Sequence, residues 1–289
     1  MSAKGTLIPI GGNEDKGIDE HEGYHLEFIE EGILSRVVKE SGGVDAIIVI
    51  VPTASSIPDE VGQNYLEAFG KLGCTNLHIM DIRERQQSED PAYISLLKKA
   101  DCVMFSGGNQ SNITKKIGGT TIHKILMERY ETDGLVIAGT SAGAMCMSEE
   151  MITGGSSQES FIKGAVGMAG GMEFVPKLII DSHFIRRGRF GRLAEAVARF
   201  PQLIGIGLAE DTGLVIKKDT FEVIGSGMVI VFDARKVKHN NHKILEEGTP
   251  MSLTNLKTNI LANGDRFNIK KKKVKVSPLG LTVTNAKTL

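Results

Sequence analysis

Short apolar runs alternate along most of the chain with longer segments whose apolar residues recur at helical spacing. The runs at 7–10, 46–51, 102–105 and 135–138 are continuously apolar, which is typical of strands buried on both faces. Their alternation with amphipathic segments predicts an α/β fold, with a mostly parallel sheet and helices on both faces. Helices are expected at 26–39, 61–72, 92–100 and 122–130, and further strands at 77–80 and 178–180.

The pattern changes after residue 203, where short apolar runs follow one another closely and are separated by turn residues. Such spacing predicts an antiparallel meander, and the segment 263–265 (Asn-Gly-Asp) predicts a hairpin. No repeat or linker divides the chain, so we expect one catalytic domain, 1–289, with a core at 1–235 and a β-rich C-terminal extension at 236–289. The meander strands are expected at 204–208, 214–217, 221–224 and 228–232.

Composition narrows the class of protein. The 289 residues carry a formal net charge of −1, which favours neither nucleic-acid nor membrane partners, and no apolar stretch reaches the length of a membrane span. Three cysteines without metal or redox spacing predict free thiols and a cytoplasmic protein. The lysines of 270–275 alternate with valine at their end, which predicts a solvated edge strand. We expect no cofactor and no metal.

A candidate nucleophile, Ser141, follows the strand at 135–138 directly. The pattern Gly139-x-Ser141-x-Gly143 is that of a nucleophile elbow, a sharp strand-to-helix turn that leaves the serine side chain exposed at the sheet edge. At a helix N-terminus, the N–H of Ala142 can donate to an oxyanion, and the N–H of Gly108 can supply a second donor.

Three glycine-containing loops each follow a predicted strand: 11–13, 107–110 and the turn at Ser141. In parallel sheets the active site lies beyond the carboxyl ends of the strands. We therefore expect these loops to converge on one edge of the sheet.

A serine nucleophile needs a base, usually histidine, oriented by a carboxylate. His183 follows the strand at 178–180, and Glu210 and Asp211 both follow the strand at 204–208, so either acid could complete a Ser-His-acid order. The rival order Ser-acid-His fits less well, since its histidines lie in a polar loop after a meander strand, where we expect them to be solvated. That rival would use His239 or His242 with Glu210, Asp211 or Asp233.

Four segments spread over about 5–235 together resemble the cyanophycinase family, a serine peptidase family that also holds dipeptidase E. The resemblance implies a class I glutamine amidotransferase-like fold, no metal and usually a homodimer. It further implies a triad of Ser141, His183 and Glu210, with Gly108 and Ala142 as oxyanion donors. The segments are Gly107-Gly108-Asn109-Gln110, Gly139-Thr140-Ser141-Ala142-Gly143-Ala144, Asp181-Ser182-His183-Phe184 with Arg187, Arg189, Arg192 and Leu193, and Gly205-Ile206-Gly207-Leu208-Ala209-Glu210-Asp211-Thr212.

The substrate implied is cyanophycin, a polyaspartate backbone with arginine on each β-carboxyl, cleaved to β-Asp-Arg dipeptides. Arginines suit its carboxylates, and Asp181 suits its guanidinium groups. Ser182 departs from the glutamine usual in the family, which puts selectivity for the aspartyl-arginine unit in question. Arg186 is expected only to face solvent. The implied substrate contacts are Gln110, Asp181, Ser182, Arg187, Arg189 and Arg192.

The sequence thus predicts a serine exopeptidase that acts on a polymeric or oligomeric Asp/Arg peptide. Two alternatives stay open. One is an aspartyl dipeptidase that acts on short free peptides, and the other is a catalytically silent, amidotransferase-like binding protein.

Overall fold

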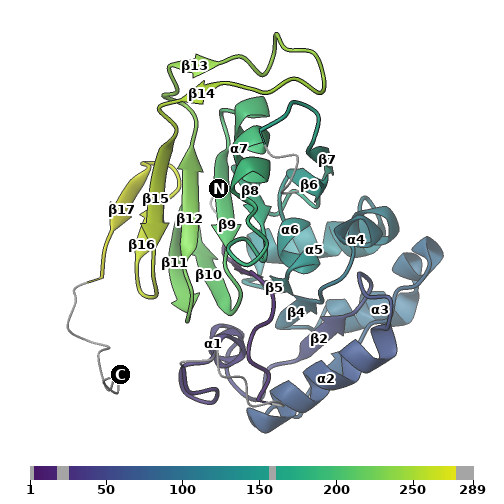
Figure 1. Cartoon of the computed structure of the whole chain (residues 1–289). Helices are drawn as coiled ribbons and strands as arrows, with labels where there is room; N and C mark the ends of the chain where they lie inside the picture. The colour runs from purple at the N-terminus through teal and green to yellow at the C-terminus, as the bar shows by residue number, and fades with distance from the viewer. Residues whose placement is uncertain (1–2, 18–25, 156–160, 278–289) are drawn as a thin grey trace.

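A nine-stranded sheet in the order β17-β16-β11-β10-β1-β5-β4-β2-β3 runs through the protein (Figure 1). The computed structural model describes residues 3–17, 26–155 and 161–277. Along the part of the sheet ordered β1-β5-β4-β2-β3, each strand is parallel to its neighbours, which confirms the expected α/β class. The parallel strands are β1 (Thr6–Ile10), β5 (Val136–Thr140), β4 (Cys102–Phe105), β2 (Ile48–Val51) and β3 (Leu77–Ile79).

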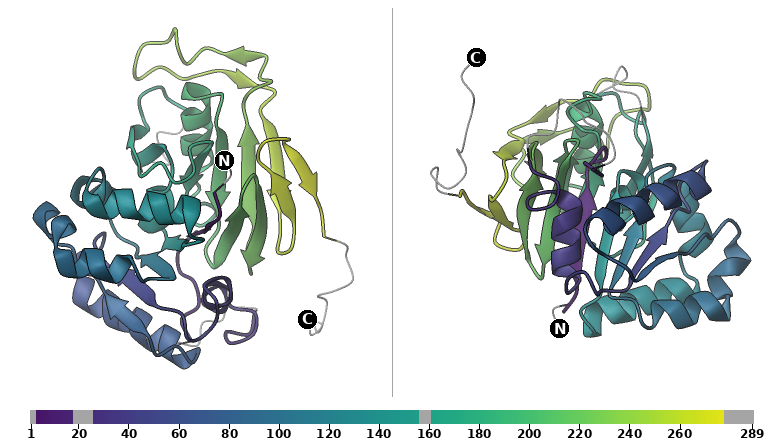
Figure 2. Two further views of the ribbon diagram at one scale, coloured as in Figure 1. Left: turned by 180° about the vertical axis from the view of Figure 1, so that it is seen from behind. Right: turned by 90° about the horizontal axis from the view of Figure 1, so that it is seen from below.

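Helices cover both faces of this parallel half (Figure 2). Because successive strand residues point to opposite faces, Leu7 and Val49 enter one apolar cluster while Ile8 and Ile48 enter another. The first cluster includes residues of α3 (Pro91–Leu97), α4 (Gln110–Ile117) and α5 (Thr121–Thr132), and the second those of α1 (Ile33–Glu40) and α2 (Pro58–Lys71). A short 3₁₀ helix, η1 (Arg85–Glu89), precedes α3.

The helix expected at 26–39 begins only at Ile33. The preceding residues form turns, and Ile29, which matches the helical spacing, is exposed. Gly32 is the N-cap with extended backbone, so the helix cannot continue toward the N-terminus through this residue.

The expected meander is wrong, because its strands divide between two sheets. β10 (Thr212–Lys217) and β11 (Thr220–Gly225) form a hairpin that extends the nine-stranded sheet from β1. In contrast, β9 (Ile204–Leu208) pairs in parallel with β8 (Leu178–Asp181) and antiparallel with β12 (Val229–Asp233). These strands and β15 (Lys257–Leu261) make a four-stranded sheet in the order β15-β12-β9-β8.

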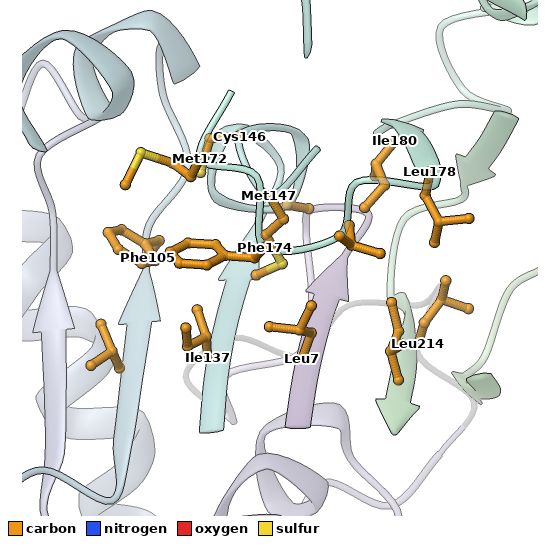
Figure 3. Packing of buried hydrophobic residues seen from close by; sticks show 14 of the residues in the cluster. Leu7, Phe105, Ile137, Cys146, Met147, Met172, Phe174, Leu178, Ile180 and Leu214 are labelled. Carbon is orange, nitrogen blue, oxygen red and sulfur yellow. The ribbon is translucent and has the colours of Figure 1, made fainter. Parts of the chain in front are cut away.

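The four-stranded sheet packs by one face against the nine-stranded sheet. Leu178 and Ile180 belong to the same buried cluster as Leu7 and Leu214 (Figure 3). Alternate residues point the other way, where α7 (Phe190–Arg199) covers them with apolar side chains that include Leu193. This packing fixes the carboxyl ends of β8 and β9, and the residues that follow them, relative to the central sheet.

The C-terminal extension supplies strands to both sheets. β15 pairs with β12, whereas β16 (Arg266–Asn268) pairs with β11, and β17 (Lys273–Lys275) pairs with β16. The turn at 263–265 therefore connects two sheets, and the hairpin expected there is wrong. Of the lysine-rich segment, residues 273–275 form the expected edge strand, β17, whereas 270–272 lie in the turn before it. Residues 278–289 of the extension lie outside the described part of the chain.

Smaller strand pairs complete the structure: β6 (Glu150–Gly154) with β7 (Gly167–Gly170), and β13 (His239–Asn240) with β14 (Leu253–Thr254). None of the helices in the described ranges combines the length and apolar character needed to cross a bilayer.

Candidate active site

Ser141 lies at the junction between β5 and the short helix α6 (Ala142–Met145). Its backbone adopts φ 50° and ψ −105°, a conformation that non-glycine residues rarely adopt. The Ser141 N–H donates to the Ile10 carbonyl at 2.9 Å, which holds the strained residue beside the end of β1. The strand-turn-helix context that a nucleophile elbow requires is therefore present.

Ser141, His183 and Glu210 come together in the structure. The His183 Nε2 lies 3.1 Å from the Ser141 Oγ, and the His183 Nδ1 lies 2.6 Å from the Glu210 Oε1. Both distances are within hydrogen-bond reach, as the transfer of a proton from serine to histidine requires. Arg186 donates to the second carboxylate oxygen of Glu210 at 2.9 Å.

The other acids and histidines point elsewhere. The Asp211 carboxylate accepts a hydrogen bond from the Ser226 hydroxyl at 2.5 Å and another from the Asp15 N–H at 3.3 Å. His239 is exposed on β13, but His242 is buried, which corrects the expectation that it is solvated. Its Nε2 lies 4.0 Å from the buried Glu195 carboxylate, so it has no place in the Ser141 cavity.

Electrostatics favour a neutral base. Burial lowers the pKa of His183, and the nearby cations Arg187 and Arg189 lower it further, although the hydrogen bond that His183 donates to Glu210 acts in the opposite direction. Burial acts to raise the pKa of Glu210, but hydrogen bonds from His183 and Arg186 outweigh it and lower that pKa. At neutral pH the imidazole is therefore neutral and its carboxylate partner is ionised.

Three successive carbonyls at the end of β1 hold the three loops of this site together. The Ile10 carbonyl accepts from the N–H of Ser141 at 2.9 Å, and the Gly11 carbonyl accepts from the N–H of His183 at 2.7 Å. The Gly12 carbonyl accepts from the N–H of Asp211, the residue after Glu210, at 2.9 Å. One short segment thus sets the relative positions of all three functional groups.

Two backbone N–H groups are available for an oxyanion. Within the described ranges, neither Gly108 nor Ala142 donates its N–H to another protein group. Gly108 has φ +136°, and a Cβ there would lie 2.1 Å from the Ala54 carbonyl oxygen, so only glycine fits at this position. The adjacent Gly107 approaches Ser141, since a Cβ on it would lie 3.6 Å from the Ser141 Cβ.

A cavity of about 860 Å³ opens over the Ser141 side chain, a volume in the usual range for ligand sites. Gly12, Gly107, Gly108 and Thr140 contribute to its wall, so the three glycine-containing loops converge as expected. The ionisable side chains in the wall are Glu14, Asp15, Lys16, Tyr65, His183, Arg186, Arg187 and Glu210.

Sequence reasoning missed the acidic and basic residues after the first glycine loop. Glu14 is buried, and it accepts hydrogen bonds from the Thr140 hydroxyl at 2.5 Å and from the Tyr65 hydroxyl, while the Lys16 ammonium lies 3.0 Å away. Burial opposes ionisation of Glu14, but Lys16 and the two hydroxyls together lower its pKa. The position of Glu14 and Lys16 in the loop that follows strand β1 was the signal by which the sequence could have placed them at the site. Nothing in the local sequence marked Tyr65 on helix α2 in this way.

Of the substrate contacts that the resemblance implied, only Arg187 lies in the cavity wall. Asp181 and Arg192 are buried and paired: the Arg192 Nε donates to Asp181 at 2.9 Å, and a second Arg192 nitrogen donates to the other oxygen. Arg189 also reaches Asp181 at 3.3 Å, and it donates to the Ser182 carbonyl at 2.7 Å. Direct contact of Asp181 or Arg192 with substrate is therefore inconsistent with their burial.

The other two implied contacts are also buried. Ser182 lies 3.5 Å from the Ser141 Oγ and donates its hydroxyl to the Met145 sulfur at 3.2 Å. The Gln110 amide donates to the Ile152 carbonyl at 2.7 Å. Arg186, which was expected only to face solvent, is 72% exposed and yet forms the ion pair with Glu210.

The described residues contain no group of three or more His, Cys, Asp or Glu side chains that could hold a metal ion. Cys74, Cys102 and Cys146 are each buried and free.

Comparisons with known proteins place the chain among peptidases. Residues 23–224 match peptidase family S51. The chain is 36% identical over 268 residues to a cyanophycinase from Geminocystis herdmanii, an alignment that covers 92% of this chain and 94% of the relative. A cyanophycinase from Trichormus variabilis is 35% identical over 270 residues, with 93% of this chain and 87% of the relative covered.

The fold also has a counterpart among solved structures. The crystal structure of a peptidase from an acI-B1 Actinobacterium matches with a TM-score of 0.58 at 19% identity, covering 89% of this chain and 97% of the other. At that level of identity the likeness concerns the fold alone.

Proposed function

The chain belongs to peptidase family S51 and is a cyanophycinase-like serine peptidase, and we propose that it hydrolyses the polyaspartate backbone of cyanophycin to β-Asp-Arg dipeptides. The observation that carries the proposal is the line of contacts from the Ser141 Oγ through His183 to Glu210, at 3.1 and 2.6 Å, inside a charged cavity. Identity to cyanophycinases over almost the whole chain supports this substrate.

The proposed reaction begins when His183 removes the proton from the Ser141 hydroxyl, which attacks an α-peptide carbonyl of the backbone. The N–H groups of Gly108 and Ala142 stabilise the resulting oxyanion; removal of a single donor of this kind typically costs about 2.7–4 kcal/mol of transition-state stabilisation. Glu210 stabilises the imidazolium, which then protonates the leaving amine. In the second half of the reaction His183 accepts a proton from the water that attacks the acyl-enzyme, and it then returns this proton to the Ser141 oxygen as the acyl group leaves.

In this proposal Arg187 binds a carboxylate of the substrate. It lies in the cavity wall, and within the described residues its guanidinium forms no ion pair with the protein. Asp181, Arg189 and Arg192 act indirectly: their buried pairing supports the segment that carries Ser182 and His183. Exopeptidase action, a homodimer and a cytoplasmic location stay predictions.

Two experiments test the proposal. A fluorophosphonate probe should label the wild-type protein and leave Ser141→Ala unlabelled under native conditions. Equal resistance of both proteins to the probe would instead favour a catalytically silent binding protein. For the substrate, the protein is incubated with insoluble cyanophycin granules and, separately, with free Asp-containing dipeptides. Release of β-Asp-Arg from granules is expected; cleavage of the dipeptides alone would favour an aspartyl dipeptidase.

A further inference from the structure

We propose that Asp15 recognises the guanidinium group of the arginine that substitutes the substrate backbone. The inference rests on the proposed function, and it names a specificity-determining residue for that reaction. It starts from the placement of Asp181, the carboxylate first expected to meet this guanidinium. Asp181 is fully buried and is paired with both Arg189 and Arg192, so it has no capacity left for a third cation.

The cavity wall contains three carboxylates within the described residues. Glu210 is engaged by His183 and Arg186 through separate oxygens. Glu14 is buried, and Lys16 supplies its counter-charge. Asp15 is the third, and it forms no ion pair with any described residue.

Local hydrogen bonds orient the Asp15 carboxylate. Its Oδ1 accepts the Gly17 N–H at 2.7 Å, while its own N–H donates to the Asp211 carboxylate at 3.3 Å. The second oxygen, Oδ2, has no hydrogen bond to the described part of the protein, and the residue is half-buried at the cavity surface. A partly desolvated carboxylate with an available oxygen is a suitable acceptor for a guanidinium N–H.

The charges of the cavity complement an aspartyl-arginine unit. Four of the charged residues in the cavity wall neutralise one another in the pairs Glu14–Lys16 and Glu210–Arg186. Apart from the titratable His183, the charged residues that remain in the wall are Asp15 and Arg187. One anion and one cation match a ligand that carries one guanidinium and a carboxylate. Asp15 thus takes the role of the guanidinium acceptor, and Arg187 that of the carboxylate partner.

The test measures binding without hydrolysis. Calorimetry on Ser141→Ala compares β-Asp-Arg with β-Asp-citrulline, in which a neutral ureido group replaces the guanidinium. Because hydrogen bonds to charged groups contribute about 1.5–3 kcal/mol, we expect about 10- to 150-fold tighter binding of the arginine compound. The same comparison is made on Ser141→Ala/Asp15→Asn and on a control, Ser141→Ala/Asp133→Asn, which changes an exposed aspartate that is not among the residues lining the cavity.

Loss of the preference in the Asp15 variant, with the preference kept in the Asp133 control, supports the proposal. A preference that persists in Asp15→Asn overturns it, as does equal or undetectable binding of the two compounds to Ser141→Ala. A weaker affinity of the Asp15 variant that is equal for the two compounds also supports the proposal, because the preference measured on Ser141→Ala is then lost. An unchanged ratio of the two affinities counts against it. Granule hydrolysis by the wild type is scored separately, so failure of the proposed function remains distinguishable from failure of this assignment.

Discussion

A Cβ atom on Gly12 would lie 2.5 Å from the Cε1 and Nε2 atoms of the His183 imidazole. Gly12 also has φ +100° and gives its carbonyl to the loop that carries Glu210. The backbone at Gly12 therefore packs directly against the His183 imidazole. The absence of a side chain at residue 12 allows the imidazole to reach Ser141.

Gly12→Ala should lower kcat by roughly 100-fold, since displacement of a reacting group by about 1 Å costs on that order. The added methyl group must push the imidazole away from Ser141. Gly42→Ala is the matched control, because Gly42 has φ +105° and nothing within 4 Å of a Cβ, so it introduces the same backbone strain without the contact. Steady-state kinetics and a melting curve are measured for both. Similar kcat values for the two variants would contradict the prediction.

Glu210 and Arg186, which form an ion pair, should differ greatly in their contribution to kcat. Glu210→Gln should lower kcat by about 10³–10⁴-fold, as loss of the orienting carboxylate does in comparable triads. Arg186→Gln should lower it by less than about 5-fold, since an exposed ion pair contributes about 0–1 kcal/mol. A loss of more than 100-fold for Arg186→Gln would show that the guanidinium takes part in the chemistry.

The acid limb of reactivity should lie below the ordinary histidine pKa of about 6.5. Burial and the charges of Arg187 and Arg189 lower the pKa of His183, and only the neutral imidazole accepts the Ser141 proton. Reactivity is therefore present above this lowered pKa and is lost as pH falls through it. Arg187→Gln removes one of the lowering charges and should move the midpoint to higher pH.

The midpoint is measured from the rate of fluorophosphonate labelling against pH, which requires no peptide substrate and is thus independent of any role of Arg187 in binding. A midpoint for Arg187→Gln at or below the wild-type value would be inconsistent with this account.

The buried Asp181 should contribute to stability. Asp181→Ala leaves the buried Arg192 without its counter-charge, and breaking a buried pair in this way costs about 3–5 kcal/mol. The free energy of unfolding is measured with urea. Replacement of both residues by apolar ones, Asp181→Leu/Arg192→Met, should recover much of that loss. Unchanged stability with a raised KM would instead indicate that Asp181 contacts substrate directly.

The parallel half of the fold could be predicted because its signals are local. A continuous apolar run marked β4 at its observed bounds, since a strand covered on both faces buries every side chain. The pairing of β9 could not be predicted in the same way. The strand that follows it in the chain is β10, yet β9 pairs with β12 as well as with the preceding strand β8, and this choice is decided by how the second sheet packs on the first.

In the candidate site, too, some residues could be predicted from local sequence and others only from the fold. Ser141 and His183 could be proposed from position, because each follows a buried strand, and the carboxyl ends of such strands form the site edge. Glu210 and Asp211 are adjacent, and position alone could not separate them. The fold separates them: Asp211 has φ 44° and turns its carboxylate to Ser226, while Glu210 reaches His183.

By itself, then, the sequence determined which segments form the central strands and helices, where the candidate nucleophile lies and which histidine follows a strand end, since the spacing of buried residues and the residues of a turn are properties of neighbouring positions. Only the tertiary structure decided which charges are used up inside the protein and which remain at the cavity. Asp181 and Asp15 are both aspartates near glycine-rich or strand-end segments, yet one is fully paired in the interior and the other borders the site. That difference depends on partners distant in the chain, because a charge enters the interior only where packing brings a compensating charge to it.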